Sequence, residues 1–142
     1  MSSRSLPRDR EANRLPCVFP LALLGRVAVC ELATTPPADA PLACPSPLAR
    51  AACAGLHGLL RNQAAFALGL RPGRPCALPR ATALKVQCGG LLGLQEMLDP
   101  EALAPDVHRL ARLAQQHEGG LGALPTLSLI RKIAAWRDSR VE

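Results

Sequence analysis

Six cysteines are the residues of this chain most able to do chemistry. They stand at positions 17, 30, 44, 53, 76 and 88 of a 142-residue sequence. No two of them form a Cys-x-x-Cys pair, because 12, 13, 8, 22 and 11 residues separate successive members. Zinc ribbons, ferredoxin-type clusters and thioredoxin-like redox sites all use closer pairs. Any site that these thiols share must therefore be assembled by the fold.

Three explanations of the cysteines are open: buried free thiols, disulfides, or ligands to a metal. A free cysteine is often buried like a small apolar residue, and disulfides require an oxidising compartment. Residues 1–30 match an export signal only in part, because Pro20 and Arg26 interrupt the apolar run and Asp9 and Glu11 dilute the basic start. We expect a cytoplasmic protein, and whether residues 1–30 act as an export signal stays open.

Four cysteines form the most economical ligand set for zinc or an iron–sulfur cluster. They lie before, or early in, the first long helix that we expect, so that one folded segment could gather them: Cys17, Cys30, Cys44 and Cys53. Further ligands could come from His57, Cys76 and Cys88. Only the pair of Cys53 and His57 is fixed by spacing, since residues four apart share a helix face. The same pair also fits an ordinary core face.

The elements that must position these residues are predicted to be mainly helical. Residues 1–14 are polar and charged and predict a flexible basic tail, followed by a single helix-rich domain over 15–142. The five prolines of residues 34–47 predict an extended connection. Residues 26–32 predict a short strand that pairs with residues 17–21.

A strong helix start follows this connection, with Ser46 as N-cap, Pro47 at the first helical position and Gly69 as the stop. Apolar periodicity predicts four helices, over 47–68, 80–98, 105–118 and 125–138. We expect Leu127, Ile130, Ile133 and Ala134 to point inward from the last helix. The fold class is therefore a small bundle of about four helices, preceded by a Pro-rich, cysteine-bearing segment with at most a short β-hairpin.

Glycines interrupt the second of these helices. The run from Val86 to Gly90 predicts a break or kink, and Gly93 extends the stretch that lacks side chains. Close packing against another helix and approach of a ligand to the backbone both explain such a surface. Close packing is the more common reason.

Charge and composition bear on the partners. The formal net charge is +6, whereas aromatic residues make up only 2% of the chain. A basic chain attracts nucleic acid without specificity, but base stacking needs aromatic side chains. We expect a protein partner, with nucleic acid as a weaker alternative. No apolar run reaches the roughly 18–20 residues of a membrane-spanning helix, so no transmembrane segment is expected.

No arrangement of acids, histidines and nucleophiles indicates catalysis, so no catalytic residue is assigned. The leading hypothesis is a non-catalytic accessory protein with a cysteine-ligated metal or iron–sulfur site. The alternative is a metal-free helical adaptor or regulator. It would bind a protein or nucleic acid through the basic C-terminal hairpin, with Arg131, Lys132 and Arg137 as the contacting residues.

Overall fold

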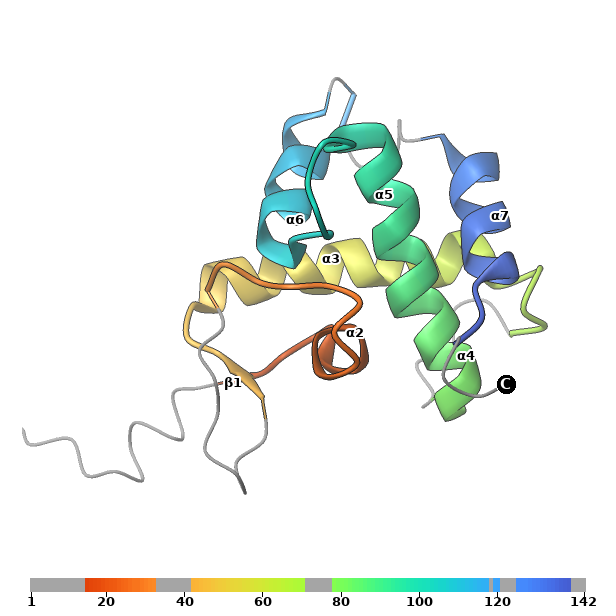
Figure 1. Cartoon of the computed structure of the whole chain (residues 1–142), viewed down its shortest axis with the longest axis horizontal. Helices are drawn as coiled ribbons and strands as arrows, with labels where there is room; N and C mark the ends of the chain where they lie inside the picture. Colours follow the sequence, from red (N-terminus) through yellow and green to blue (C-terminus); the bar gives the residue numbers. More distant parts are fainter. Residues whose placement is uncertain (1–14, 33–41, 71–77, 118, 121–124, 139–142) are drawn as a thin grey trace, which may run out of the picture.

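The computed structural model describes residues 15–32, 42–70, 78–117, 119–120 and 125–138 (Figure 1). The mainly α fold is confirmed, with one short antiparallel sheet in the described part. The elements in chain order are β1 (Leu15–Pro16), α2 (Pro20–Leu24), β2 (Ala43–Cys44), α3 (Pro47–Ala64), α4 (Arg80–Leu84), the π-helical segment η1 (Lys85–Gly89), α5 (Gly90–Leu98), α6 (Val107–Gln116) and α7 (Thr126–Ala135).

The helices form one packed body. In Figure 1, α3 runs horizontally behind the continuous rod of α4, η1 and α5, and α6 and α7 lie on either side of α5. Helix α3 packs on α6 and α7, while α7 also packs on η1 and α5. No helix in the described ranges combines the length and apolar character needed to cross a bilayer.

The start of α3 follows the sequence prediction. The Ala49 N–H donates to the Ser46 hydroxyl at 3.2 Å, and Pro47 occupies the first helical position, where no donor is needed. The helix ends at Ala64, four residues before the predicted Leu68. A turn replaces the last helical turn and closes at Gly69, whose φ of 70° is favourable only for glycine.

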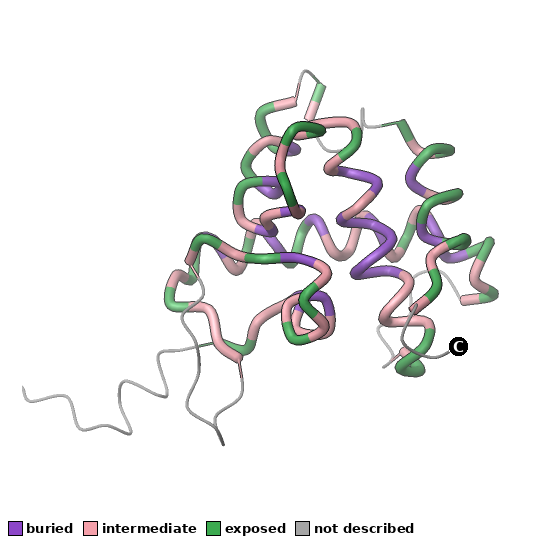
Figure 2. Tube along the Cα trace, in the orientation of Figure 1, coloured by how far each residue is buried: buried purple, intermediate pink, exposed green. Residues whose placement is uncertain are grey.

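Burial follows the apolar period of the sequence on α6 but not the predicted inward face of α7. The apolar residues that repeat at helical spacing along α6 are all buried: Val107, Leu110, Ala111 and Ala114. On α7 the inward face consists of Leu129 and Ile133, four residues apart, whereas Leu127 is 69% exposed. The prediction for Leu127 and Ala134 was wrong, because contact with α5 and η1 selects a narrower stripe than the apolar pattern suggests (Figure 2).

Glycine lets α7 approach the π-helical segment closely. A Cβ atom added at Gly89 would lie 2.7 Å from Ile133 Cα and 2.7 Å from the Lys132 carbonyl oxygen. One added at Gly90 would lie 2.7 Å from a Leu60 methyl carbon on α3. Close helix packing is therefore the structural role of these two glycines.

The expected break in the second long helix is the π-helical turn η1. This wider turn contains Gln87, a polar residue that is only 6% exposed. The Leu21 and Ala22 N–H groups donate to its Oε1 at 2.9 and 3.2 Å. Helix α2 receives no cap from its own N-cap residue Phe19. A side chain distant in sequence therefore supplies the cap that α2 lacks.

The segment before α3 wraps the bundle, and we call its described residues, 15–32 and 42–46, the wrap. Its strand pairing differs from the prediction. Residues 17–21 run into α2, and the sheet pairs β1 with β2. Val29 instead forms a single parallel bridge with Asp106, so residues 26–32 cross to α6. The predicted tail, residues 1–14, lies outside the described residues, as does most of the Pro-rich connection.

Substitution of Gly89 by alanine should destabilise the protein. The added methyl group would meet the backbone of α7, which cannot move without displacing the helix, and such overpacking typically costs about 1–3 kcal/mol. The control is Gly58→Ala on α3, where a Cβ atom meets nothing within 4 Å; it should stabilise the helix by about 0.5–1 kcal/mol. Urea denaturation measures both. Equal stability of G89A and wild type would contradict this packing.

Replacement of Gln87 by methionine keeps the length of the side chain and removes the cap on α2. Two amide groups would lose their acceptor, at an expected cost of about 1–3 kcal/mol in unfolding free energy. The exposed Gln116 provides the control, and Gln116→Met should change stability by less than about 0.5 kcal/mol. Hydrogen exchange at Leu21 and Ala22 should accelerate in Gln87→Met. Unchanged protection of these two amides would show that Gln87 does not hold α2.

Candidate functional site

Four cysteines line one cavity where the wrap meets α3, and we call this cavity the cysteine pocket. They are the four that the sequence singled out: Cys17, Cys30, Cys44 and Cys53. The rest of the lining is apolar apart from one cation: Val18, Phe19, Leu23, Leu32, Ala43, Pro45, Val107 and Arg50. Thiols up to 36 residues apart in sequence (53 − 17) thus share one lining.

The register of the short sheet places two of these thiols on one face. Leu15 is paired with Cys44, and Cys17 continues β1 by donating its N–H to the Leu42 carbonyl at 3.1 Å. Since side chains alternate along a strand, Cys17 and Cys44 are diagonal neighbours on the same face. Such neighbours have Cα atoms about 7–8 Å apart. That separation is beyond the usual reach of a disulfide, which ends near 7 Å.

The third thiol of the wrap is placed by a bridge to the start of α6. The Val29 N–H donates to the Pro105 carbonyl at 2.9 Å, and the Val107 N–H donates back to the Val29 carbonyl at 2.8 Å. Cys30 follows directly in the chain. Its position in the pocket therefore depends on the docking of residues 26–32 against α6.

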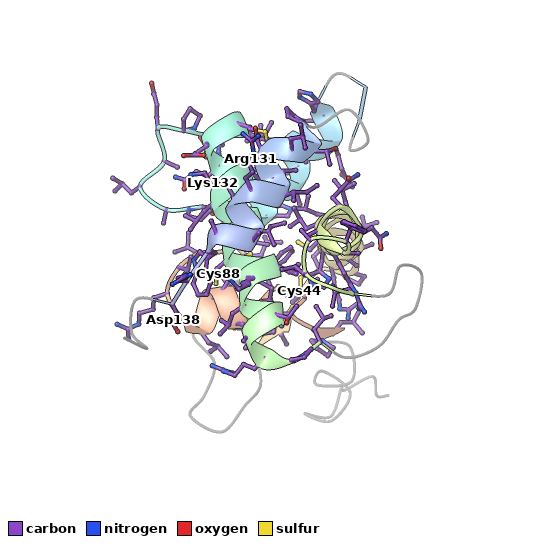
Figure 3. All side chains as sticks on the ribbon, turned by 90° about the vertical axis from the view of Figure 1, so that its right-hand side faces the viewer. Cys44, Cys88, Arg131, Lys132 and Asp138 are labelled. Carbon is purple, nitrogen blue, oxygen red and sulfur yellow. The ribbon has the colours of Figure 1, made fainter. Side chains whose placement is uncertain are left out.

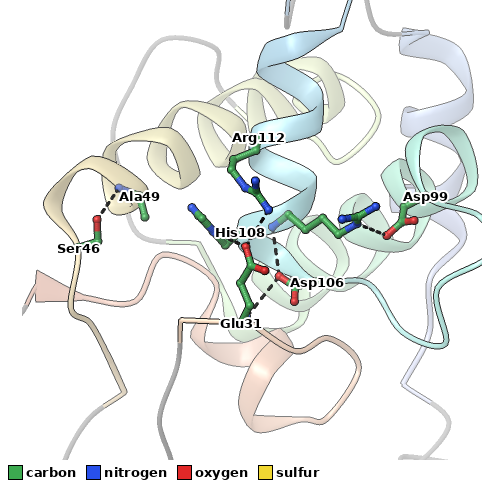
Figure 4. Close-up of polar contacts among 8 residues, drawn as sticks. Glu31, Ser46, Ala49, Asp99, Asp106, His108 and Arg112 are labelled. Atoms are coloured by element: carbon green, nitrogen blue, oxygen red, sulfur yellow. Dashed lines mark hydrogen bonds and ion pairs between the residues drawn. The ribbon is translucent and has the colours of Figure 1, made fainter.

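Side-chain contacts of Glu31 also hold residues 26–32 against α6 (Figure 4). His108 Nδ1 and an Arg112 guanidinium nitrogen lie 2.5 and 3.0 Å from Glu31 Oε1. The hydrogen bond to His108, with the nearby Arg112 charge, lowers the pKa of the Glu31 carboxyl. Asp106 caps α6 by accepting from the Arg109 N–H at 3.1 Å and also accepts weakly from the Glu31 N–H at 3.4 Å. Side chains on both partners thus reinforce the crossing beside Cys30.

Helix α3 supplies the fourth thiol and the positive charge. Cys53, in its second turn, is 8% exposed. Arg50 lies three residues earlier, on the same side of the helix, and its Nε–H donates to the Pro16 carbonyl at 2.8 Å. Cys44 precedes the helix and donates its S–H to the Ser46 carbonyl at 3.3 Å. The N-terminal end of a helix favours negative charge, so both the dipole and Arg50 favour thiolates here.

Burial raises the pKa of two of the four thiols, Cys53 and Cys17. It raises the pKa of Cys53 from its ordinary value of 9.0 to about 12, with smaller contributions from Cys30, Cys44 and Cys17. Burial likewise raises the pKa of Cys17, where Cys30 and Cys44 add to the effect. The mutual effects show that the four sulfur atoms are electrostatic neighbours. A bound cation would counter this effect and favour the thiolate forms of Cys17 and Cys53.

The size of the pocket limits its occupant. The volume of the pocket is about 20 Å³, and one water molecule needs about 10–15 Å³ of such volume. The space between the side chains, as they stand, is therefore enough for one water-sized species. Among the described residues, no group of three or more His, Cys, Asp or Glu side chains is already drawn together as a metal site, and the described cysteines are free thiols.

Two of the further ligands that the sequence suggested, His57 and Cys88, do not line the pocket. The His57 ring instead packs edge-on against Phe19 at a centroid distance of 5.5 Å, and burial lowers its pKa. Cys88 lines a separate cavity near the end of α7. Cys76 lies outside the described residues. Arg50 and Gln87 were missed, although the spacing of Arg50 and Cys53 was a visible signal.

The basic residues of the C-terminal hairpin do not act as one free patch. Arg131 and Lys132 are exposed on α7 (Figure 3), but Lys132 Nζ pairs with Glu96 Oε1 at 2.9 Å. Arg137 lies beyond the end of α7 and lines the same cavity as Cys88. The three cations therefore sit in different environments.

Thiol reactivity tests the described burial. In metal-free protein at pH 8, Cys53 and Cys88 should be alkylated far more slowly than the half-buried Cys44, because they are buried and their pKa values of about 12 and about 11 leave little of the nucleophilic thiolate. Between about pH 9 and 12 the unfolded chain ionises before the folded one, so stability should fall as the pH rises. Peptide mass analysis after timed alkylation gives the order. Equal rates at Cys53 and Cys44 would contradict it.

Comparisons of the chain with protein-family models, curated proteins and solved structures found no match.

Proposed function

We propose that this chain is a non-catalytic accessory protein in which Cys17, Cys30, Cys44 and Cys53 bind one structural zinc ion. The observation that carries the proposal is the shared lining: four cysteines from separate segments meet around one cavity. Apolar packing alone gives no reason for all four cysteines of the region to meet there.

The size of the pocket supports zinc over an iron–sulfur cluster. Zinc is bound by four thiolates at about 2.3 Å in structural sites. Room of about 20 Å³ accepts a single ion once the sulfur atoms turn inward by side-chain rotation. A cluster would require the wrap to move away from α3.

Charge around the pocket supports thiolate ligands. Four thiolates and Zn²⁺ carry a net charge of about −2 by simple addition, which a buried site must offset. Arg50 lines the pocket and the N-terminal end of α3 lies beside Cys44. Both place positive charge where the ligands would carry negative charge.

The distribution of ligands indicates a structural role. Three cysteines belong to the wrap and Cys53 belongs to α3, so one ion would fasten the wrap to the helical body. Four protein ligands leave no open coordination position for a substrate. Binding free energy would then appear as folding free energy of the wrap. We further propose a cytoplasmic location, because reduced thiols persist there, and a protein partner.

Metal analysis of single variants tests this proposal. Untagged protein purified without oxygen should contain one zinc per chain and no acid-labile sulfide. Cobalt substitution should give the visible absorption of tetrahedral thiolate coordination. Cys→Ser at any of the four positions should weaken metal binding by about tenfold or more and lower stability, because a ligand is lost.

Cys88→Ser is the control, because Cys88 is buried, as Cys53 is, but lies in another cavity. It should retain one metal ion and the cobalt spectrum even if its stability falls. If the protein contained iron with matching sulfide, the bound group would be an iron–sulfur cluster and the proposal of zinc would be wrong. Metal-free protein that is folded and indifferent to added zinc would overturn the proposal.

A further inference from the structure

A second cavity lies on the side of the molecule where α2 ends, and we call it the Cys88 cavity. Figure 3 shows Cys88 and Asp138 close together there. The volume of this cavity is about 180 Å³, compared with about 20 Å³ for the cysteine pocket. Its lining combines apolar and charged residues: Leu21, Gly25, Arg26, Val27, Leu84, Cys88, Trp136, Arg137 and Asp138. The cavity is separate from the cysteine pocket, and the inference below does not depend on the metal.

Arg26, which lines this cavity, has an unfavourable backbone conformation. Its φ of 61° is the sole positive value found for a non-glycine residue in the described ranges. The Arg26 N–H donates to the Leu23 carbonyl at 3.1 Å and the Val27 N–H to the Ala22 carbonyl at 3.0 Å, the pattern of a helix end that normally uses glycine. Strain of this kind is often retained where the side chain has a function.

Two guanidinium groups give the cavity its charge preference. Arg26 and Arg137 are exposed, and neither guanidinium group has a hydrogen-bond or ion-pair partner among the described residues. Asp138 also lines the cavity but does have such a partner. Two positive charges and one negative charge leave a net charge of +1, which favours an anion. Guanidinium groups are well suited to carboxylates because they donate two parallel hydrogen bonds.

The remaining walls set the size and character of the ligand. Trp136, Leu84 and Val27 are apolar, and burial raises the pKa of Cys88 to about 11, so its thiol is neutral at pH 7. An apolar cavity of about 150 Å³ holds a benzene molecule. The volume of about 180 Å³ therefore accommodates an apolar group of about six carbon atoms.

We propose that the Cys88 cavity binds a small organic carboxylate with an apolar body of about six carbon atoms. Arg26 and Arg137 bind the carboxylate, and the body packs between Trp136 and Leu84. The unfavourable backbone of Arg26 is retained because glycine, which suits the turn, could not bind the anion.

Trp136 reports on this cavity directly, because it is the only tryptophan of the chain. Titration of the full-length protein with hexanoate should change its fluorescence in a saturable way. Hexanol, which lacks the charge, and acetate, which lacks the apolar body, should each bind at least about tenfold more weakly, as expected for loss of a charge-assisted hydrogen bond or of the apolar contact.

Arg26→Gly separates binding from folding. It should weaken hexanoate binding by about tenfold, yet raise the unfolding temperature by about 2–4 °C, because glycine relieves the strained turn. Arg137→Gln should also weaken binding. Lys132→Ala is the control, because Lys132 shares with Trp136 the neighbouring hollow between α5 and α7; its binding curve should match that of wild type.

Three results would overturn the proposal. The first is the absence of a saturable response to hexanoate, and the second is equal binding of hexanol and hexanoate. The third is unchanged affinity in Arg26→Gly, which would show that Arg26 has no part in binding. Because Arg26→Gly should be more stable than wild type, loss of folding cannot explain a loss of its binding.

Discussion

The hydrogen bonds from the α2 backbone to Gln87 connect the wrap to the helical bundle. Helix α2 has five residues and no side-chain cap from its own N-cap residue, so it cannot be stable in isolation. Gln87 supplies the missing acceptor only because the π-helical turn η1 presents a buried side chain toward the wrap. The docking of α2 then fixes Cys17 on one side of it and Cys30 on the other, and both reach the cysteine pocket.

The same π-helical turn serves the other face of the molecule. Its Gly89 lets the backbone of α7 approach closely, and its Cys88 lines the second cavity together with Trp136. One irregular turn thereby organises the wrap, the C-terminal helix and the space between them. Such turns replace the regular hydrogen-bond pattern at a cost, and they are often found where a protein needs a particular side chain in a particular place.

Much of this fold was predictable from local signals, whereas for the candidate site the sequence indicated only which residues to consider. Ser46 and Pro47 fix the start of α3 through short-range chemistry, and the stripe on α6 is a simple period of the sequence. The pairing of Val29 with Asp106 and the cap from Gln87 join residues more than 60 positions apart, which no local pattern encodes. The shared lining of Cys17 and Cys53 arises from these long-range contacts, so composition suggested the set while the fold supplied the geometry.

Under the proposed function, the four thiols of the cysteine pocket bind one ion. X-ray absorption at the zinc edge, on untagged protein purified without oxygen, tests it most directly because it counts the ligand atoms. The account predicts stoichiometric zinc with four sulfur neighbours at about 2.3 Å. Zinc bound mainly by nitrogen or oxygen, or a folded protein that holds no metal, would contradict it.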